Sequence, residues 1–381
     1  MKKAIYAFSG DPITYGHIDI VKRASKIFDE VVVGIGQNPE KNYMFTLEER
    51  TDMAKRALSN MKNVRVVSFT GLLVDFAYEN NIPVIIKGIR NNTDFDYEVL
   101  LHSMGDSQKL GIETFIVPAK RELAHISSST VKALQSEQGL INEYVPLYVK
   151  QMLEARMSGQ FIIGVTGEIG TGKSFVCEKL KEIGDREKVS VHHIELDHIG
   201  HRILGELKDP SYEKIRKEII ESFGSKVKLK NGFISRKELG EIVFSDNEKL
   251  KKLNSIMRKP MLVRLRKELA EKRGLILFNA ALLSESEMTY LCNNNVILIT
   301  ADKKSQERRM KKRGLSKEQI ERRLSSQYKS KEKKQKIKEQ IKKYNNGKIW
   351  LMDNSDGDNL KKIEKMFNEI VLYASNTLKF K

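Results

Sequence analysis

The feature that most constrains the fold is the octapeptide GEIGTGKS at residues 167–174. It fits the pattern G-x-x-x-x-G-K-S, whose glycines let backbone amides wrap around phosphate groups. The apolar run Phe161–Thr166 precedes it, and the helical stretch FVCEKLKEIG follows it. This strand–loop–helix context predicts a phosphate-binding loop (P-loop), in which Lys173 reaches the β- and γ-phosphates and the Ser174 hydroxyl ligates Mg²⁺.

A second run, HHIELDHIG at 192–200, carries the acidic residue Asp197. We expect a strand that delivers this carboxylate to its end, where it could orient an attacking hydroxyl or accept its proton. The alternative is an aspartate that caps a helix. The surrounding histidines lack the partner cysteine or glutamate pattern of a zinc site. These histidines are His192, His193, His198 and His201.

An arginine-rich segment lies further along, at residues 295–327, and is predicted to form a strand and two helices around a turn at Gly314. In a small P-loop kinase, such a helical pair is the lid that closes over ATP, excludes water and neutralises charge. The Lys-rich stretch 329–348 behind it still permits a helix, whose simplest interpretation is a solvated face. The arginines that flank the turn are Arg309, Arg313, Arg322 and Arg323.

The chain before residue 157 alternates between short β-branched runs and helical stretches. Such alternation predicts a parallel sheet with helices on both faces and ligands beyond the carboxyl ends of its strands. We therefore predict two doubly wound α/β domains, residues 1–157 and 158–381. In the first, the expected strands are Ala4–Phe8, Glu30–Ile35, Val64–Phe69, Val84–Ile86 and Thr114–Val117, and the expected helices are 16–28, 46–59, 71–80, 95–109 and 127–135.

Four segments of the first domain place polar or basic side chains where a strand meets a helix or loop. Thr14 and His17 fall in the first turn after a strand, where helix amides and the helix dipole attract anions. They lie three residues apart and can face one oxygen, although His17 alone could equally be a capping or packing histidine. Lys41, the segment 87–90 (KGIR) and the segment 126–132 (ISSSTVK) occupy the same kind of junction. Together they suit a triphosphate.

The net charge of +18 on the 381 residues is unevenly distributed. Residues 1–157 hold 19 basic and 19 acidic side chains, residues 158–381 hold 49 and 31, and residues 303–343 alone hold 18 and 5. A pI near 9.5 admits nucleic acid, anionic lipid or phosphorylated small molecules as partners. Nucleic acid is disfavoured, because the basic segment has few aromatic residues and no base-reading motif.

Cysteine usage and hydropathy bear on the cellular compartment. Cys177 and Cys292 cannot form a disulfide framework, so a reducing cytosol is the simpler expectation. No apolar run approaches the roughly 18–20 residues of a membrane span. The apolar stretch near the N-terminus is too short for the core of a signal peptide. We therefore expect a cytoplasmic protein without a membrane partner.

The first domain resembles bacterial phosphopantetheine adenylyltransferase, of the T/H-x-G-H nucleotidyltransferase superfamily. The resemblance covers its whole length, through AIYxxxxDPITxGHIDIVKRA, MFTLEER, GIRxxxDFxYE, ISSSTVK and a terminal helix that begins at Val145 and Pro146. It implies a Rossmann-like fold, a homo-oligomer formed through this domain, and transfer of AMP from ATP to 4′-phosphopantetheine, which gives dephospho-CoA and pyrophosphate. The substrate phosphate attacks the α-phosphorus in line, and the protein positions both reactants and neutralises charge.

The same resemblance implies residue roles. His17 would stabilise the pentavalent phosphate with Thr14 nearby, and Lys41 would be a second catalytic residue that binds phosphate. The implied ATP-binding residues are Ser9, Thr14, His17, Lys87, Gly88, Arg90, Glu98, Ile126, Ser127, Ser128, Ser129 and Thr130. The implied phosphopantetheine-binding residues are Ser9, Lys41, Leu72, Leu73 and Lys87.

The second domain resembles dephospho-CoA kinase over essentially its full length. The matching segments are GxxGxGKS, I-x-x-D (194–197), R-x-x-L…VF (236–244), L-L-x-E (282–285), Q-x-x-R-x-x-x-R (306–313) and R-x-L-x-x-Q (322–327). The resemblance implies ATP-dependent phosphorylation of the ribose 3′-hydroxyl of dephospho-CoA, with Asp197 as base and Mg²⁺ on Ser174. The implied ATP-binding residues are Glu168, Ile169, Gly170, Thr171, Gly172, Lys173, Ser174, Arg309 and Arg313.

Both domains depart from the family patterns at single positions. Phe8 stands where a glycine is usual, and Lys87 and Lys132 stand for arginines, which keeps the charge but loses bidentate geometry. Lys259 and Ala281 stand for a histidine and a proline. Because the implied product of the first domain is the implied substrate of the second, the leading hypothesis is a bifunctional enzyme for the last two steps of CoA synthesis. The alternatives are that one half has become regulatory or structural, or that the protein binds nucleic acid.

Overall fold

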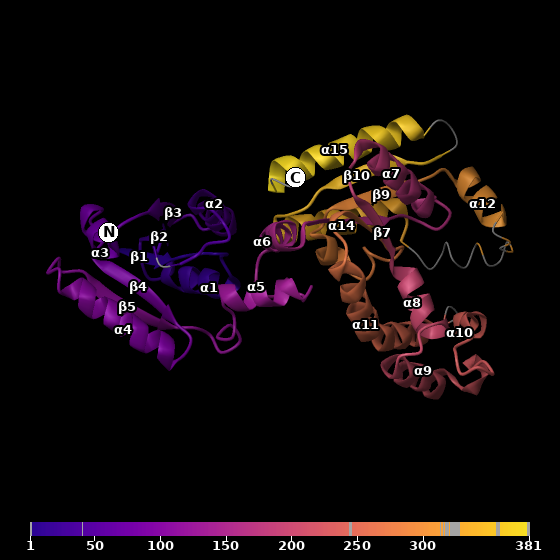
Figure 1. Cartoon of the computed structure of the whole chain (residues 1–381), viewed down its shortest axis with the longest axis horizontal. Coiled ribbons are helices and arrows are strands. Elements are labelled where there is room, and N and C mark those ends of the chain that lie inside the picture. Colours follow the sequence, from indigo (N-terminus) through magenta and orange to yellow (C-terminus); the bar gives the residue numbers. More distant parts are fainter. Residues whose placement is uncertain are drawn as a thin grey trace. The chain divides into compact units, whose positions relative to one another are not determined.

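The computed structural model describes residues 2–39, 41–243, 246–312, 314, 316, 320, 328–355 and 359–378. The chain forms two compact units, Met1–Lys150 and Gln151–Lys381 (Figure 1). Each unit is built around one five-stranded parallel sheet with helices packed against it, as predicted. Within the described residues, every helix is too short or too polar to cross a membrane.

The first unit has the strand order β3-β2-β1-β4-β5. The strands are β1 (Lys3–Phe8), β2 (Glu30–Gly36), β3 (Val64–Phe69), β4 (Val84–Ile89) and β5 (Glu113–Pro118). The helices are α1 (Tyr15–Ala24), α2 (Leu47–Leu58), α3 (Leu73–Glu79), α4 (Asn92–Asp106), α5 (Ser128–Ser136) and α6 (Leu147–Leu153), and α6 crosses the boundary between the units. The expected strands and helices of this part are therefore confirmed, with ends that differ by a few residues.

The strand order of the first unit reverses beside β1. The chain moves outward from β1 through β2 to β3, then crosses to β4 on the other side of β1. At such a reversal, the loops beyond the carboxyl ends of the two strands diverge and leave a crevice. The loop that follows β1 carries Thr14, His17 lies directly after it in the first turn of α1, and Arg90 follows β4, so predicted site residues flank this reversal.

The second unit has the order β10-β9-β6-β8-β7. Its strands are β6 (Gln160–Thr166), β7 (Val191–Glu195), β8 (Gly274–Asn279), β9 (Val296–Thr300) and β10 (Ile349–Asp353). Its helices are α7 (Lys173–Glu187), α8 (Leu196–Gly205), α9 (Pro210–Phe223), α10 (Arg236–Val243), α11 (Asn247–Ala270), α12 (Lys303–Lys312), α14 (Ser330–Tyr344) and α15 (Leu360–Leu378), with short turns η1 (Glu154–Ser158), η2 (Ser225–Val227) and η3 (Met288–Cys292).

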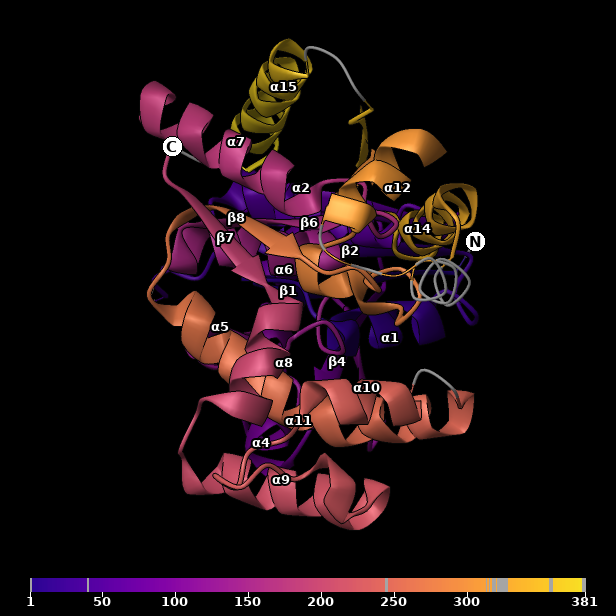
Figure 2. The same cartoon turned by 90° about the vertical axis from the view of Figure 1, so that its right-hand side faces the viewer.

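The core of the second unit surrounds β6, which is buried along its whole length, as expected of a central parallel strand. On one face, α7 and α15 pack against the sheet through residues such as Leu180 and Phe367. The helices α8 to α11 form a separate layer on the side where the sheet ends at β7 (Figure 2). The P-loop therefore begins at the middle of the sheet, and the helical layer lies toward its β7 edge.

One predicted element is corrected. The second strand of this unit, β7, ends at Glu195, and Asp197 lies in the first turn of α8 rather than at the end of a strand. The chain turns into the helix directly after Glu195, which is the last β7 residue paired with β8. The expected second lid helix cannot be compared, because Arg313, Arg322 and Arg323 lie outside the described residues.

Candidate functional sites

His17 is held in the first turn of α1 by the residue that caps this helix. The backbone N–H of Thr14 donates to Nδ1 of His17 at 3.1 Å, and the Thr14 hydroxyl lies 3.0 Å from the same nitrogen. Because Nδ1 accepts a hydrogen bond from a backbone N–H, the proton of the neutral imidazole is on Nε2. Burial, with a smaller effect of the Arg90 charge, lowers the pKa of His17 to about 4. The ring is therefore an uncharged donor at neutral pH.

Phe8 covers one face of the His17 ring. Its ring stacks on His17, with centroids 4.3 Å apart and planes 10° from parallel. Gly10 makes this possible: its φ is +62°, and a Cβ atom there would lie 3.2 Å from Cε2 of Phe8. The phenylalanine that replaces the usual glycine is thus matched by a glycine two residues later.

Arg50 is a buried cation behind Ser9 that the sequence analysis did not single out. Its Nη1 donates to the carbonyls of Ser9 and Gly36, and its Nε donates to the carbonyl of Phe45 at 3.3 Å. The guanidinium also stacks on the ring of Tyr43, with Cζ 4.0 Å from the centroid. Arg50 therefore joins the loops that follow β1 and β2, which carry the predicted residues Ser9 and Lys41. Its only signal in the sequence is its place in MFTLEER.

Lys132 and Asp11 form a second link between loops of this site. The ammonium of Lys132 lies 2.7 Å from Oδ2 of Asp11, whose carboxylate also accepts from the backbone N–H groups of Met44 at 3.1 Å and Phe45 at 3.0 Å. A lysine is sufficient at position 132, because its ammonium makes a one-point contact with the carboxylate of Asp11. The replacement of the usual arginine at 132 therefore leaves this link intact.

The cations Lys87 and Arg90, at the end of β4 and just after it, are each paired with a carboxylate on α4. Lys87 lies 2.7 Å from Oε2 of Glu98. Arg90 donates from Nε and Nη2 to the two carboxylate oxygens of Asp94, at 2.7 and 2.9 Å. These bonds raise the pKa of Arg90 and lower the pKa of Asp94. Gly88 lies between the two cations on β4. Lys87 and Glu98, which were predicted separately as ATP-binding residues, are thus brought together.

The hydroxyls of the ISSSTVK segment gather at the start of α5. Ser127 caps the helix, because its hydroxyl accepts from the backbone N–H of Thr130 at 3.0 Å. The Ser127 hydroxyl also lies 3.0 Å from that of Ser129, and Ser128 donates to the carbonyl of Pro12 at 2.8 Å. The last contact attaches the start of α5 to the loop that carries Thr14 and His17. Ile126, which precedes the cap, is buried.

The residues predicted for the phosphopantetheine arm lie in more open positions. Lys41 is exposed in the loop after β2. Leu72 is 56% exposed just before α3, whereas Leu73 packs partly against the core of the unit. The structure therefore leaves the Leu72 side chain and the Lys41 cation accessible, and Arg50 ties the loop of Lys41 to that of Ser9.

The P-loop of the second unit is fastened by residues from later in the chain. Arg309 donates to the carbonyls of Gly170 and Thr171 at 3.3 and 3.2 Å, and Asn354 donates to that of Thr171 at 2.8 Å. A Cβ atom on Gly172, whose φ is +88°, would lie 2.3 Å from Nδ2 of Asn354. Arg309 was predicted to lie near ATP, but the contact of Asn354 with the P-loop was not expected.

Within the P-loop, Lys173 donates to the carbonyls of Gly167 and Glu168 at 2.9 and 3.1 Å. The Thr171 hydroxyl donates to the carbonyl of Glu168 at 2.8 Å, which tightens the turn. Ser174 follows Lys173 in the first turn of α7. All predicted P-loop residues from 168 to 174 therefore lie in one loop and helix start, whereas Arg313 lies outside the described residues.

Asp197 lies beside the P-loop. Burial raises the pKa of its carboxyl, and the positive charge of Lys173 opposes that rise. Nearby, Nδ2 of Asn279 at the end of β8 lies 3.2 Å from Nε2 of His193 on β7. Within the part of the chain that the structure describes, no group of histidine, cysteine and acidic residues is arranged to hold a metal ion.

The two residues of the second unit that depart from the family pattern lie in α11 and in the loop after β8. Lys259 precedes Pro260 inside α11. The carbonyl of Ala281 accepts from the hydroxyl of Thr166 at 3.1 Å and from the ammonium of Lys333 at 2.7 Å. The Lys-rich helix α14 has the expected solvated lysines, which include Lys331, Lys338, Lys342 and Lys343, but Lys333 is an exception because it is fully buried.

Comparison with known proteins relates the two units to two families. Residues 9–134 match the family model of cytidylyltransferase-like proteins, and residues 161–349 match that of dephospho-CoA kinase. Over 156 residues, the chain is 40% identical to phosphopantetheine adenylyltransferase of Haemophilus ducreyi, an alignment that covers 41% of this chain and 97% of the relative. Over 146 residues, it is 47% identical to the protein of that name from Clostridium tetani, covering 38% and 91%.

A solved structure is also similar to this chain. Dephospho-CoA kinase from Campylobacter jejuni is 22% identical, and the match covers 57% of this chain and 98% of that one, with a TM-score of 0.34.

Proposed function

Because the chain belongs to the phosphopantetheine adenylyltransferase family and carries a dephospho-CoA kinase domain in its second unit, we propose that it catalyses two consecutive reactions. The first transfers AMP from ATP to 4′-phosphopantetheine and releases pyrophosphate. The second phosphorylates the ribose 3′-hydroxyl of the resulting dephospho-CoA and gives CoA and ADP. The observation that carries this proposal is the presence of both domains in one chain, since the product of one reaction is the substrate of the other.

In the first reaction, we propose that His17 acts as a neutral hydrogen-bond donor. Its Nδ1 accepts from Thr14, so Nε2–H is the group available to a phosphate oxygen. The pKa of about 4 leaves the ring uncharged at neutral pH. As the phosphate of 4′-phosphopantetheine attacks the α-phosphorus, negative charge builds on the equatorial oxygens, and a preorganised donor stabilises it more than in the ground state. No proton needs to be removed from the attacking phosphate.

The positive charge for this reaction is proposed to come from lysines and an arginine around the crevice. Lys41 and Lys87 would bind the attacking phosphate, whereas Arg90 and the hydroxyls of 127–130 would hold the β- and γ-phosphates of ATP. The carboxylates of Glu98 and Asp94 form ion pairs with Lys87 and Arg90. This pairing presets the geometry of two flexible side chains, which lowers the entropy lost when ATP binds.

Supporting positions follow from the same site. We propose that Ser9 helps to place the attacking phosphate, because Arg50 binds its carbonyl and fixes its loop. Leu72 and Leu73 would contact the apolar part of the pantetheine arm. Glu98 would act on ATP through Lys87, with which it is paired.

In the second reaction, we propose that Lys173 exchanges its two carbonyl partners for oxygens of the β- and γ-phosphates. Ser174 offers a hydroxyl oxygen beside the P-loop, which suits Mg²⁺, an ion that prefers oxygen ligands. When bound there, Mg²⁺ would neutralise phosphate charge. Asp197 would accept the proton of the 3′-hydroxyl as its oxygen attacks the γ-phosphorus and ADP leaves. Its raised pKa makes it a stronger base than an exposed aspartate.

A coupled assay tests the proposal. Purified protein with 4′-phosphopantetheine, ATP and Mg²⁺ should release pyrophosphate and accumulate CoA. If dephospho-CoA accumulates without CoA, the second unit has lost its activity and the regulatory alternative gains support. If no pyrophosphate appears, the first reaction is not catalysed.

We also propose that the first unit self-associates through α4. The side chains of α4, all of which the structure describes, include none that is buried. Its apolar residues Phe95, Val99, Leu100 and Met104 are 42, 39, 58 and 60% exposed. An apolar face of this kind on one helix is typical of an interface. Size-exclusion chromatography with light scattering should give a mass above one chain, and Leu100→Asp should lower it.

A further inference from the structure

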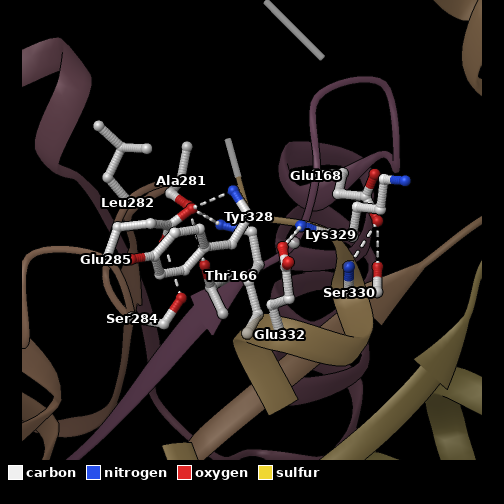
Figure 3. A network of polar contacts seen from close by, with 12 residues as sticks. Thr166, Glu168, Ala281, Leu282, Ser284, Glu285, Tyr328, Lys329, Ser330 and Glu332 are labelled. Carbon is white, nitrogen blue, oxygen red and sulfur yellow. Dashed lines mark hydrogen bonds and ion pairs between the residues drawn. The ribbon is translucent and has the colours of Figure 1, made fainter. Parts of the chain in front are cut away.

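The first turn of α14 binds two carboxylates that come from different loops of the second unit (Figure 3). Glu168 of the P-loop accepts hydrogen bonds from the backbone N–H of Ser330, at 2.7 Å, and from its hydroxyl. Glu285, in the loop after β8, accepts from the backbone N–H of Tyr328 at 3.2 Å and pairs with the ammonium of Lys333. The start of one helix therefore contacts both loops.

Lys333 is the buried cation of this cluster. Its side chain is 0% exposed, and its Nζ also donates to the carbonyl of Ala281 at 2.7 Å. The same carbonyl accepts from Thr166, the last residue of β6 before the P-loop. A buried charge is costly unless it is paired and hydrogen-bonded, and Glu285 and Ala281 provide both. Burial lowers the pKa of Lys333, and the negative charge of Glu285 opposes this.

Ser330 has a different role in the cluster, because its partner belongs to the P-loop itself. A carboxylate at the start of a helix interacts favourably with the helix dipole, and Ser330 is the first residue of α14. Glu168 would repel a bound triphosphate if its side chain turned toward it. Its two bonds to Ser330 keep the carboxylate on the helix (Figure 3).

The strand order places both loops at the proposed reaction centre. From its central strand to one edge, the sheet runs β6-β8-β7. The P-loop follows β6 and Asp197 follows β7, so the loop after β8, which contains Ala281 and Glu285, starts between them. In parallel sheets, substrates bind at these carboxyl ends. The loop after β8 therefore lies where the acceptor must approach the γ-phosphate.

We propose that Ser330 and Lys333 are positioning residues of the kinase site. Ser330 holds the P-loop carboxylate away from ATP, and Lys333 fixes the loop after β8 against which the acceptor nucleotide binds. This inference rests on the proposed phosphorylation of dephospho-CoA. It also gives a role to the one lysine of the Lys-rich helix that is buried, while the exposed Lys338 on the same helix provides a matched comparison.

Steady-state kinetics of the full-length protein test the two roles separately, with ATP and dephospho-CoA varied in turn. Ser330→Ala should raise KM for ATP about tenfold and leave KM for dephospho-CoA within about twofold. Lys333→Met should raise KM for dephospho-CoA at least about tenfold, with a smaller change in KM for ATP. Lys333→Arg keeps the charge and should recover part of that loss. Lys338→Met should behave as the wild type.

A purely structural role has a different signature. It would lower the fraction of folded enzyme, so kcat would fall while both KM values stayed unchanged, and that result in both Ser330→Ala and Lys333→Met overturns the inference. If Lys333→Met does not melt cooperatively, it is not folded and its KM values are not used. The inference is then tested by KM for ATP of Ser330→Ala, which removes only a hydroxyl. If the wild type and Lys338→Met both fail to phosphorylate dephospho-CoA, the proposed function fails and the inference falls with it.

Discussion

The aromatic ring of Phe8 lies flat against the imidazole of His17, with the centroids 4.3 Å apart. This stack covers one face of the ring that we place at the transferred phosphate, and the bond from Thr14 fixes its in-plane orientation. The stack on Phe8 and the bond from Thr14 thus restrain the His17 side chain, which has few rotamers available. The family pattern usually has glycine at the position of Phe8, and a glycine could not make this stack.

Removal of the stack should change the acid–base behaviour of His17. In Phe8→Ala, water gains access to the imidazole, and its pKa should rise from about 4 toward the ordinary value of about 6.5. The acid limb of the pH profile of adenylyl transfer should shift upward by the same amount. Tyr78→Ala, which removes an exposed aromatic ring, is the control. An unchanged acid limb in Phe8→Ala would mean that the stack does not set the pKa.

The depressed pKa of His17 also makes stability depend on pH. The folded value, about 4, lies below the unfolded value of about 6.5, so protons bind preferentially to the unfolded chain. The associated stability is complete above the unfolded pKa and is lost as the pH falls toward the folded one. Between pH 7 and pH 5, the melting temperature of the first unit should fall less in His17→Gln than in the wild type. Equal decreases in calorimetry would contradict this assignment.

The two reactions should be separable by single substitutions. His17→Ala should abolish pyrophosphate release from 4′-phosphopantetheine and ATP, but it should leave phosphorylation of added dephospho-CoA unchanged. Lys173→Ala should have the opposite effect, because it removes the phosphate-binding ammonium of the P-loop alone. Each variant serves as the folding control of the other. If either one abolished both reactions, the two sites would not be independent.

Arg50 should be required for the stability of the first unit. Arg50→Met leaves the buried carbonyls of Ser9, Gly36 and Phe45 without this donor, so the unfolding free energy should fall by roughly 3 kcal/mol. Arg65→Met, which breaks an exposed ion pair with Glu30, should cost less than about 1 kcal/mol. The two variants are compared by urea denaturation, with circular dichroism following the unfolding transition of the first unit. Similar losses would show that the buried contacts of Arg50 contribute little.

The segment after Lys150 should stabilise the second unit. Glu154 is buried and accepts from Nδ2 of Asn293, which is itself fully buried. Glu154→Ala removes this buried hydrogen bond and should cost roughly 2 kcal/mol. Trp350 is the single tryptophan of the chain and lies in this unit, so its fluorescence reports the unfolding. Glu221→Ala, at an exposed position, should leave the transition unchanged, and an equal shift in both variants would argue against the contact.

The sequence by itself determined the two parallel α/β units, the P-loop and the helix start that carries Thr14 and His17. These depend on local patterns: the alternation of apolar runs with helical stretches, glycines before a Lys-Ser pair, and hydroxyls at the start of a helix. Such signals lie within about ten residues of one another and can be seen without the fold.

Only the tertiary structure decided which distant residues complete these sites. Arg50 contacts Ser9 across 41 residues, Asn354 contacts Thr171 across 183, and Glu168 contacts Ser330 across 162. No local pattern distinguishes Lys333 from the other lysines of its helix, because its burial depends on where α14 meets the loop after β8. A lysine looks the same in the sequence wherever it lies in the fold. Only its surroundings determine whether its charge is solvated or buried in an ion pair.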